Sequence, residues 1–334
     1  MTSYIVRRVL QLLLVLWGGA TLLFFLFFVM SGNPAERMAS GGGNRNPDPQ
    51  VVLNLEKKYG LDKPVPVQYV TYMKGLVKGD LQESFYGNTP VSDIIAERAP
   101  NSLRLAFWAV LIEAVFGIGG GMISARRRNS IADYTTTITA VVLSAVPVFV
   151  LGYVLKQIFG VTAFKHGWPA WASFPTRGLG DDEWVFGVLP ATRATAKALV
   201  LPAIVLASVT TALLARLTRT SMLETMRMDH VRTARSKGLT EGRVMRRHVL
   251  RNGLVPVITV LGPDFGTMVG VAVLTEQVFQ IQGLGSRIVQ AASALDIYVA
   301  VGLVMVVTLV YGVCSLVVDV SYAYLNPRVR LGDD

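Results

Sequence analysis

Residues 229–239 read Asp-His-Val-Arg-Thr-Ala-Arg-Ser-Lys-Gly-Leu, and this basic stretch lies between two long apolar runs. Its basic character continues through Arg246-Arg-His-Val-Leu-Arg-Asn252, after which the next apolar run begins. Two membrane spans joined by a short loop rich in Lys and Arg are typical of a connection on the cytoplasmic side. The stretch therefore indicates a membrane protein that exposes a basic, helix-forming loop to the cytoplasm.

Apolar residues make up 52% of the chain, and they come in runs too long for a soluble core. The run over residues 9–30 contains no ionisable group and is long enough to cross a hydrocarbon layer of ~30 Å at ~1.5 Å per residue. Because lipid offers the backbone no hydrogen-bond partners, such spans should be helices. The sequence predicts an all-α integral membrane protein with six spans, over residues 9–30, 102–125, 134–155, 198–215, 253–275 and 297–318.

The first span follows Arg7 and Arg8, as the apolar region of a signal peptide also would. It is longer than an ordinary signal, and no small-x-small cleavage site closes it, since Ser31-Gly-Asn-Pro34 follows. We interpret residues 1–30 as a retained N-terminus and first span.

Charge is distributed unevenly around these spans. The formal net charge is +10, and Lys and Arg outnumber Asp and Glu by 8 to 3 over residues 222–251, whereas residues 31–98 contain 8 of each kind. Positive residues on cytoplasmic loops orient membrane proteins, so both termini are expected to be cytoplasmic. The basic composition thus reports topology, and nucleic-acid binding is not expected.

Residues 31–101 form an external segment that is long enough to have structure of its own. Asp48-Pro49 and Thr89-Pro90 each place a polar residue before a proline, an arrangement that begins helices. Two or three short helices against the outer membrane face are predicted. Residues 102–334 would then form the core domain, with five spans and the basic loop at about residues 222–252.

A second external segment, over about residues 157–197, is rich in aromatic residues, among them Trp168 and Trp184. Such rings favour the membrane interface, and an interfacial belt is the favoured interpretation. The alternative is a contact surface for a delivering protein or a lining for the mouth of a pathway.

Signatures of enzymes are absent from the sequence. It contains no G-x-x-x-x-G-K-[ST] phosphate loop, no H-E-x-x-H helix and no G-x-S-x-G elbow. The three histidines are scattered without partners at metal-ligand spacing, and the single cysteine, Cys314, permits no internal disulfide. We expect neither a catalytic set nor a metal site in this chain.

The spacing of the basic stretch is specific. Arg232-Thr-Ala-Arg-Ser-Lys-Gly238, followed after nine residues by His248-Val-Leu250, resembles the cytoplasmic EAA loop of permease subunits of binding-protein-dependent ABC importers, and most of all the dipeptide/oligopeptide permease branch. The resemblance covers nearly the whole chain, including Tyr59-Gly-Leu-Asp-Lys-Pro64, Gly79-Asp-Leu-Gln-Glu-Ser84, Ser144-Ala-Val-Pro-Val-Phe149 and Glu276-Gln-Val-Phe279 with Gly283-Leu-Gly285. Gln82 stands where the family usually has glycine, and Gln282 where it usually has proline.

This resemblance implies the type I ABC importer permease (MetI-like) fold and a non-catalytic subunit that forms half of a translocation pathway for short peptides. It implies a second homologous permease chain in a heterodimer, two ATPase subunits that carry ATP and Mg²⁺, and an extracytoplasmic solute-binding protein. The implied location is the bacterial inner membrane, with lipid around the spans. No cofactor is expected on this chain itself.

Within the loop, the resemblance implies a helix–turn–helix peg that inserts into a groove of an ATPase. Gly238 would relieve the turn, Ala234 would permit close approach, and the basic side chains would pair with acidic groups of the ATPase. The ATPase-coupling residues would be Asp229, Arg232, Thr233, Ala234, Arg235, Lys237, Gly238, Leu239, His248 and Leu250.

Two acids fall near the middle of spans, Glu113 in the second and Asp264 in the fifth. Burying a charge in a membrane is expensive, so such residues indicate function by default. Either acid could line a hydrated pathway or bond a neighbouring helix for structural reasons, and both interpretations stay open. Acids near span ends, such as Glu276, are expected to extend toward the aqueous boundary. The other candidates are Ser144 and Pro147 for the pathway, and Trp168, Trp184 and Gln282 for external contacts.

Three alternatives to a peptide permease are weighed against it. The same machinery could import a non-peptide solute, such as a metal chelate or glutathione. A secondary transporter driven by an ion gradient would show internal repeats and broken helices around a midplane ion site, and no clear repeat is present. An integral-membrane enzyme would need a clustered catalytic set at one membrane face.

Overall fold

The computed structural model describes residues 2–30, 32–39, 47–179, 184–185 and 187–325 of the 334 residues. Within these ranges the chain is helical except for its connecting loops and one short antiparallel strand pair, β1 (Trp184–Val185) with β2 (Leu189–Pro190). Six helical stretches are long and apolar enough to cross a membrane, which confirms the predicted number. They are Ile5–Val29, Val91–Arg126, Val148–Lys165, Arg193–Thr225, Val255–Phe279 and Ile297–Val318.

Several of these stretches combine α-helix with a short π-helical piece. The first is α1 (Thr2–Phe24) with η1 (Phe25–Val29), and the second is α5 (Val91–Glu113), η2 (Ala114–Ile118) and α6 (Gly119–Arg126). The third is α8 (Val148–Leu155), η3 (Lys156–Thr162) and α9 (Ala163–Lys165). The others are α10 (Arg193–Thr225), α14 (Val255–Phe279) and α16 (Ile297–Leu325).

The centre of the bundle is α10, which contacts α5, α6, α7 and α14, while α14 also packs on α16 and α16 on α1. Small residues allow these helices to approach closely, because helix association in lipid depends on packing rather than on a hydrophobic driving force. A Cβ atom at Gly266 on α14 would lie 2.6 Å from the Cα atom of Tyr311 on α16. A Cβ atom at Gly121 on α6 would lie 2.6 Å from the carbonyl oxygen of Ala215 on α10.

The third span differs from the prediction. A single helix was expected over residues 134–155, but the chain breaks into α7 (Ile131–Ala145) and α8, and the span is Val148–Lys165. The break follows from Pro147, because a proline disfavours helical backbone at the residue before it, and Val146 is extended with ψ 126°.

The external segment contains three short helices, α2 (Pro34–Ala39), α3 (Pro49–Tyr59) and α4 (Val65–Val77). Asp48 begins α3 as predicted, since its side chain accepts a hydrogen bond from the backbone N–H of Gln50 at 2.9 Å. The predicted two or three short helices are thus confirmed, and Thr89-Pro90 also precedes a helix as predicted. The helix that begins at Val91 runs without interruption into the second span.

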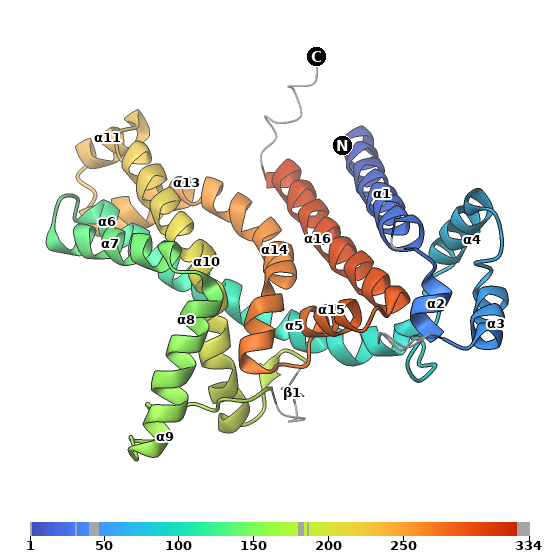
Figure 1. Cartoon of the computed structure of the whole chain (residues 1–334). Coiled ribbons are helices and arrows are strands. Elements are labelled where there is room, and N and C mark those ends of the chain that lie inside the picture. The colour runs from blue at the N-terminus through green and yellow to red at the C-terminus, as the bar shows by residue number, and fades with distance from the viewer. Residues whose placement is uncertain (1, 31, 40–46, 180–183, 186, 326–334) are drawn as a thin grey trace.

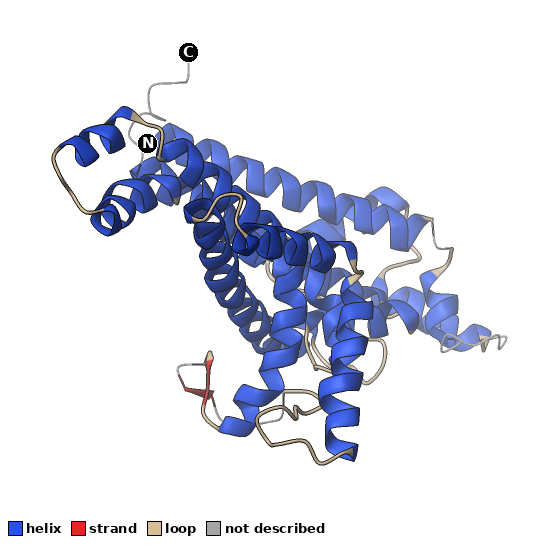
Figure 2. Cartoon of the chain, turned by 90° about the vertical axis from the view of Figure 1, so that its left-hand side faces the viewer, coloured by secondary structure: helices blue, strands red, loops and turns tan. Residues whose placement is uncertain are grey.

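One end of the bundle gathers the basic loop and the ends of two outer helices. In Figure 1, α11 (Asp229–Ser236), the N-terminal end of α1 and the C-terminal end of α16 all lie toward the top. The elements α9 and β1 lie toward the bottom, and Figure 2 shows the strand pair at the same lower end. The first and the last described helix therefore both have their outer ends on the same side of the bundle as the basic loop.

Candidate functional site

The basic loop folds as a chain of short helices between α10 and α14. After α11 come α12 (Glu241–Val244), the π-helical η4 (Met245–Val249) and α13 (Leu250–Gly253). Thr240 begins α12 from an extended backbone, and Lys237 ends α11. The predicted helix–turn–helix is confirmed in its local structure.

The inner face of the loop has a small hydrophobic core of its own. Val231 and Ala234, three residues apart on α11, are buried against Met222 of α10 and against Val244 and Val249 of the following helices. The expectation for Ala234 was contact with the ATPase, but the side chain is only 4% exposed. Its small size instead lets α11 pack closely on the rest of the loop. Leu239, His248 and Leu250 are half-buried beside this core.

The outer face of α11 carries the polar residues of the motif. Asp229, Arg232, Thr233, Arg235 and Lys237 are all exposed. The Arg235 guanidinium donates a 2.8 Å hydrogen bond to Glu241, which joins the two sides of the turn, whereas Arg232 approaches Asp229 at 3.7 Å on the same helix. Exposed pairs of this kind contribute ~1 kcal/mol or less, so both arginines remain available to a stronger acidic partner.

Gly238 makes the turn between α11 and α12. Its φ angle is +77°, in the left-handed region that other residues adopt only at a cost, and its N–H donates to the Arg235 carbonyl at 2.9 Å. No atom lies within 4 Å of the position that a Cβ atom would occupy. The glycine is therefore required by backbone conformation and not by crowding.

Hydrogen bonds attach the loop to its neighbours. His230 lies 3.1 Å from the side-chain amide of Asn252, and Ser221 on α10 donates to the Gly253 carbonyl at 2.8 Å. The Arg219 guanidinium of α10 donates two 2.8 Å hydrogen bonds to the carboxylate of Asp133 on α7. Hydrogen bonds therefore connect the loop to α10, and α10 to α7.

Of the four pathway candidates, the structure brings together only Glu113 and Asp264. Glu113 on α5 lies beside Asp264 on α14 and Thr210 on α10. Glu113 is 1% and Asp264 8% exposed, and neither Glu113 oxygen has a hydrogen-bond partner among the described residues. The pair lies between three helices of a single chain.

Ser144 and Pro147 lie apart from that pair, at the break between α7 and α8. Both are exposed, and the Ser144 hydroxyl donates only to the Val141 carbonyl of its own helix, at 3.0 Å. The break lies directly before the span Val148–Lys165, and both side chains are exposed there.

The external-contact candidates differ in their surroundings. Trp184 on β1 is partly buried, and the Arg104 guanidinium lies 4.2 Å from its ring centroid. Trp168 is half-exposed and packs edge-on against Phe159 with 6.3 Å between ring centroids. Gln282 is exposed, and its side-chain carbonyl accepts a 2.9 Å hydrogen bond from Arg98.

Two buried carboxylates, one before and one after α15 (Leu284–Ser293), were not predicted. The expectation that Glu276 extends to water was wrong, because it is fully buried and accepts hydrogen bonds from the Ser102 hydroxyl at 2.6 Å and the Ser286 N–H at 2.7 Å. Asp296 is 1% exposed and accepts from the Ser84 hydroxyl. Glu276 and Ser84 both belong to the family motifs quoted above. Those motifs were the only feature of the sequence that could have pointed to these buried contacts.

Comparison with known proteins agrees with these features. The model of the binding-protein-dependent transport system inner membrane component matches residues 117–331, and the N-terminal model for the membrane component of such systems matches residues 1–106. The dipeptide permease DppB of Alkalihalophilus pseudofirmus is 34% identical over 336 residues, covering 99% of this chain and 100% of that protein. The di/tripeptide permease DppB of Pseudomonas aeruginosa is 37% identical, and the glutathione permease GsiC of Escherichia coli is 33% identical, each covering 99% of both chains.

Six apolar spans with a folded basic loop packed against one end, together with these matches, define a transport permease. The chain belongs to the family of binding-protein-dependent transport system inner membrane components. It is accordingly a non-catalytic subunit of an ABC importer, and its location is the inner membrane.

Proposed function

We propose that this permease imports short peptides and that residues 229–250 couple it to ATPase subunits. The observation that carries the coupling proposal is the two-sided structure of α11, in which Val231 and Ala234 anchor the helix while Arg232 and Lys237 face outward. A folded peg with a basic outer face can enter an acidic groove without rearranging its interior. Differential contact of the peg with two states of the ATPases would drive the transport cycle.

The topology follows from the same loop. A basic loop belongs on the cytoplasmic side, so the N-terminal end of α1 and the C-terminal end of α16, which lie on its side of the bundle, are cytoplasmic as well. Residues 1–30 then provide the first span, residues 31–101 the external segment and residues 102–334 the core.

The partners we propose are a second homologous permease chain, two ATPase subunits and a solute-binding protein. The exposed break at Ser144 and Pro147 marks the surface where the second chain and the pathway adjoin this chain. The solute-binding protein would dock on the external side, near Trp168 and the Arg98–Gln282 pair. Trp184 contributes through packing.

We propose a structural role for Glu113 and Asp264. Their burial between α5, α10 and α14 of one chain supports a role in holding these helices together. The pathway would then run elsewhere, along the exposed α7–α8 surface.

The test of the coupling proposal compares two charge reversals in the intact transporter. Arg232→Glu on α11 should reduce ATP-driven uptake of a labelled dipeptide and the recovery of ATPase subunits on co-purification. Arg127→Glu, an exposed arginine between α6 and α7, is the matched control and should leave both unchanged. Equal effects of the two variants, or full uptake by Arg232→Glu, would refute the assignment of the loop.

The substrate is tested by competition. In a strain that lacks the chromosomal copy, uptake of a labelled dipeptide should be restored by this chain and suppressed by unlabelled di- and tripeptides. A relative of similar identity is a glutathione permease, so glutathione is the second candidate and is tested in the same assay. Competition by glutathione alone would reject the peptide assignment while leaving the coupling loop untouched.

A further inference from the structure

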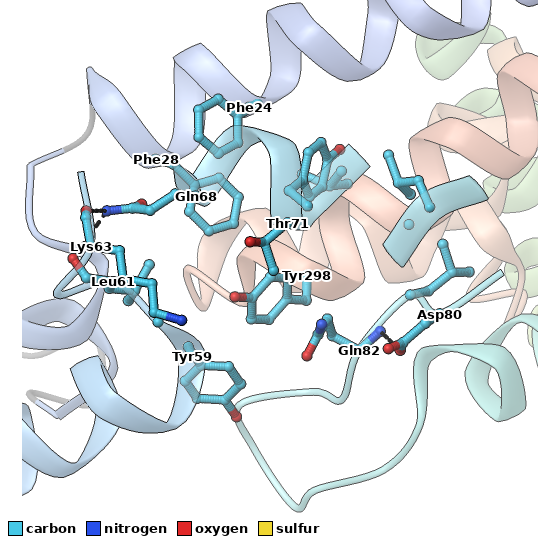
Figure 3. A pocket seen from close by; sticks show the side chains of 16 residues that line it. Phe24, Phe28, Tyr59, Leu61, Lys63, Gln68, Thr71, Asp80, Gln82 and Tyr298 are labelled. Atoms are coloured by element: carbon cyan, nitrogen blue, oxygen red, sulfur yellow. Dashed lines mark hydrogen bonds between the residues drawn. The ribbon is translucent and has the colours of Figure 1, made fainter. Parts of the chain in front are cut away.

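A cavity of about 60 Å³ lies between α1, the external helices α3 and α4, and the start of α16 (Figure 3). At 10–15 Å³ for each water position, it has room for about four to six water-sized groups. No role for this cavity follows from the coupling loop or from the pathway, which lie on other elements.

Aromatic rings form much of its wall. Phe24 comes from the end of α1, Phe28 from η1, Tyr59 from the end of α3, and Tyr298 from the start of α16. The Tyr298 ring centroid lies 5.6 Å from that of Phe28 and 5.3 Å from that of Tyr59. Clustered aromatic rings attract ammonium groups, because their faces carry negative potential.

Two tyrosine hydroxyls in this region lack partners. Tyr298 is only 8% exposed, its hydroxyl points into the cavity in Figure 3, and it makes no hydrogen bond within the described residues. The hydroxyl of Tyr72, which also lines the cavity, is buried and unpartnered. Buried hydroxyl groups are normally hydrogen-bonded, so these two indicate a polar occupant.

Opposite charges stand at the two sides of the cavity. Figure 3 shows Lys63 on the side of Leu61 and Asp80 on the other side, beside Gln82. The Asp80 carboxylate accepts a 3.0 Å hydrogen bond from the Gln82 N–H, and neither charged group has an ion-pair partner in the described part of the chain. The arrangement suits a ligand that carries a cation and an anion a short distance apart.

The cavity also lies at the boundary of the membrane. Phe24 and Phe28 are close to the end of the span Ile5–Val29, and Tyr298 is the second residue of the span Ile297–Val318. Exposed apolar residues at the same end of the first span, such as Leu22 and Leu26, would contact acyl chains. Phospholipid headgroups lie at this depth of the membrane, so they are the ligands that the position of the cavity favours.

We propose that the cavity binds the zwitterionic headgroup of an ethanolamine phospholipid. The ammonium group lies against the aromatic rings and Asp80, and the phosphate faces Lys63. The Tyr298 and Tyr72 hydroxyls complete the polar contacts of the headgroup. Bound lipid would join α1 to the external helices and to α16.

The test uses the full-length chain in its transporter complex, reconstituted in nanodiscs that contain either phosphatidylethanolamine or phosphatidylglycerol. Native mass spectrometry of the released complex counts the retained lipid. Wild type should retain the ethanolamine lipid about tenfold more strongly than the glycerol lipid, because the latter has no ammonium group. Equal retention of the two lipids would overturn the proposal.

Variants locate the site. Lys63→Gln, Asp80→Asn and Tyr298→Phe should each reduce retention of the ethanolamine lipid severalfold, whereas Lys78→Gln, an exposed lysine at the end of α4, should not. A retained lipid that is insensitive to all three variants would place it elsewhere and refute the site. Tyr298→Phe keeps the ring and removes only the hydroxyl, so its result does not depend on lost packing.

A third arm separates lipid from soluble ligands with the same charges. Free phosphoethanolamine and a dipeptide are each added to the complex in detergent without lipid. The lipid proposal expects no protection against thermal unfolding from either at millimolar concentration, since both lack acyl chains. Protection by the dipeptide that is lost in Asp80→Asn would overturn the proposal in favour of a peptide site.

Discussion

Ser102 on α5 donates a 2.6 Å hydrogen bond to Glu276 on α14, and both residues are fully buried. The same hydroxyl accepts a hydrogen bond from the Leu284 N–H at the start of α15 (Leu284–Ser293), at 2.8 Å. One serine therefore joins three helices on the side opposite the basic loop. Residue 283 has to be a glycine, because a Cβ atom at this position would lie 2.5 Å from the Ser102 hydroxyl.

Ser102→Ala should destabilise the chain by about 1–3 kcal/mol, because it leaves a buried carboxylate oxygen and a buried N–H without a partner. Thermal unfolding in detergent measures the loss. Ser92→Ala, an exposed serine on the same helix, is the control and should change the midpoint little. Equal midpoints for the two variants would contradict the role of Ser102.

Gln82→Gly should stabilise the chain by up to about 1 kcal/mol, because Gln82 has φ 65° where glycine is unstrained. The variant Gln82→Ala distinguishes relief of backbone strain from loss of the Gln82 side chain. It keeps the strained conformation, so it should give no such gain in the thermal unfolding midpoint. A gain of the same size in both variants would show that the side chain, rather than the backbone, is responsible.

Gly238→Ala should lower ATP-driven uptake several-fold, because a side chain disfavours φ +77° by about 1 kcal/mol and the turn would reorganise. Gly242→Ala is the matched control, since Gly242 has ordinary helical geometry and open space around it. This control should be neutral or slightly stabilising. Uptake rates are compared at equal membrane abundance, and equal rates for both variants would argue against a conformational requirement at Gly238.

The Asp133–Arg219 pair predicts a pH dependence. Hydrogen bonds from the Arg219 guanidinium, and then from the Ser124 hydroxyl, hold the pKa of the Asp133 carboxyl below its usual range. A depressed pKa in the folded chain contributes stability above the unfolded pKa of about 3.9, and that stability is lost as the pH falls further.

The unfolding midpoint of wild type should therefore exceed that of Asp133→Asn by a constant amount between pH 7 and pH 5. The difference should narrow below about pH 4. A difference that stays constant below about pH 4 would mean that the carboxyl has an ordinary pKa, and one that grows as the pH falls would mean a raised pKa.

Glu113→Gln should preserve both abundance and substrate preference. An amide in this position can donate a hydrogen bond to Asp264 and removes one buried acid. Competition by a panel of peptides, with membrane abundance measured in parallel, distinguishes the two interpretations of this residue. A shifted preference at normal abundance would place Glu113 on the pathway.

The sequence predicted features that depend on local composition. Six apolar runs, the basic loop and the Asp48 cap were all expected, because hydropathy and capping act over a few neighbouring residues. Pro147 is also a local signal, but it lies within an apolar run that is long enough to predict one continuous helix.

Contacts between distant residues could not be predicted in this way. Glu276 looked like an acid at a span end, and only its meeting with Ser102, 174 residues away in sequence, makes its burial favourable. Ala234 seemed suited to a partner surface, yet the packing of α11 on Met222 and Val249 turns it inward. Glu113 and Asp264 were each noticed alone, and their adjacency depends on how α5 and α14 cross.

The length of α10 has a mechanical consequence. This helix has 33 residues, so it is about 50 Å long, and it ends at the base of α11. A tilt of about 5° about one end of α10 displaces its other end by about 4 Å, given that length. Under the proposed coupling, a small rotation produced at the basic loop would therefore reach the opposite end of the bundle as a displacement of several ångströms.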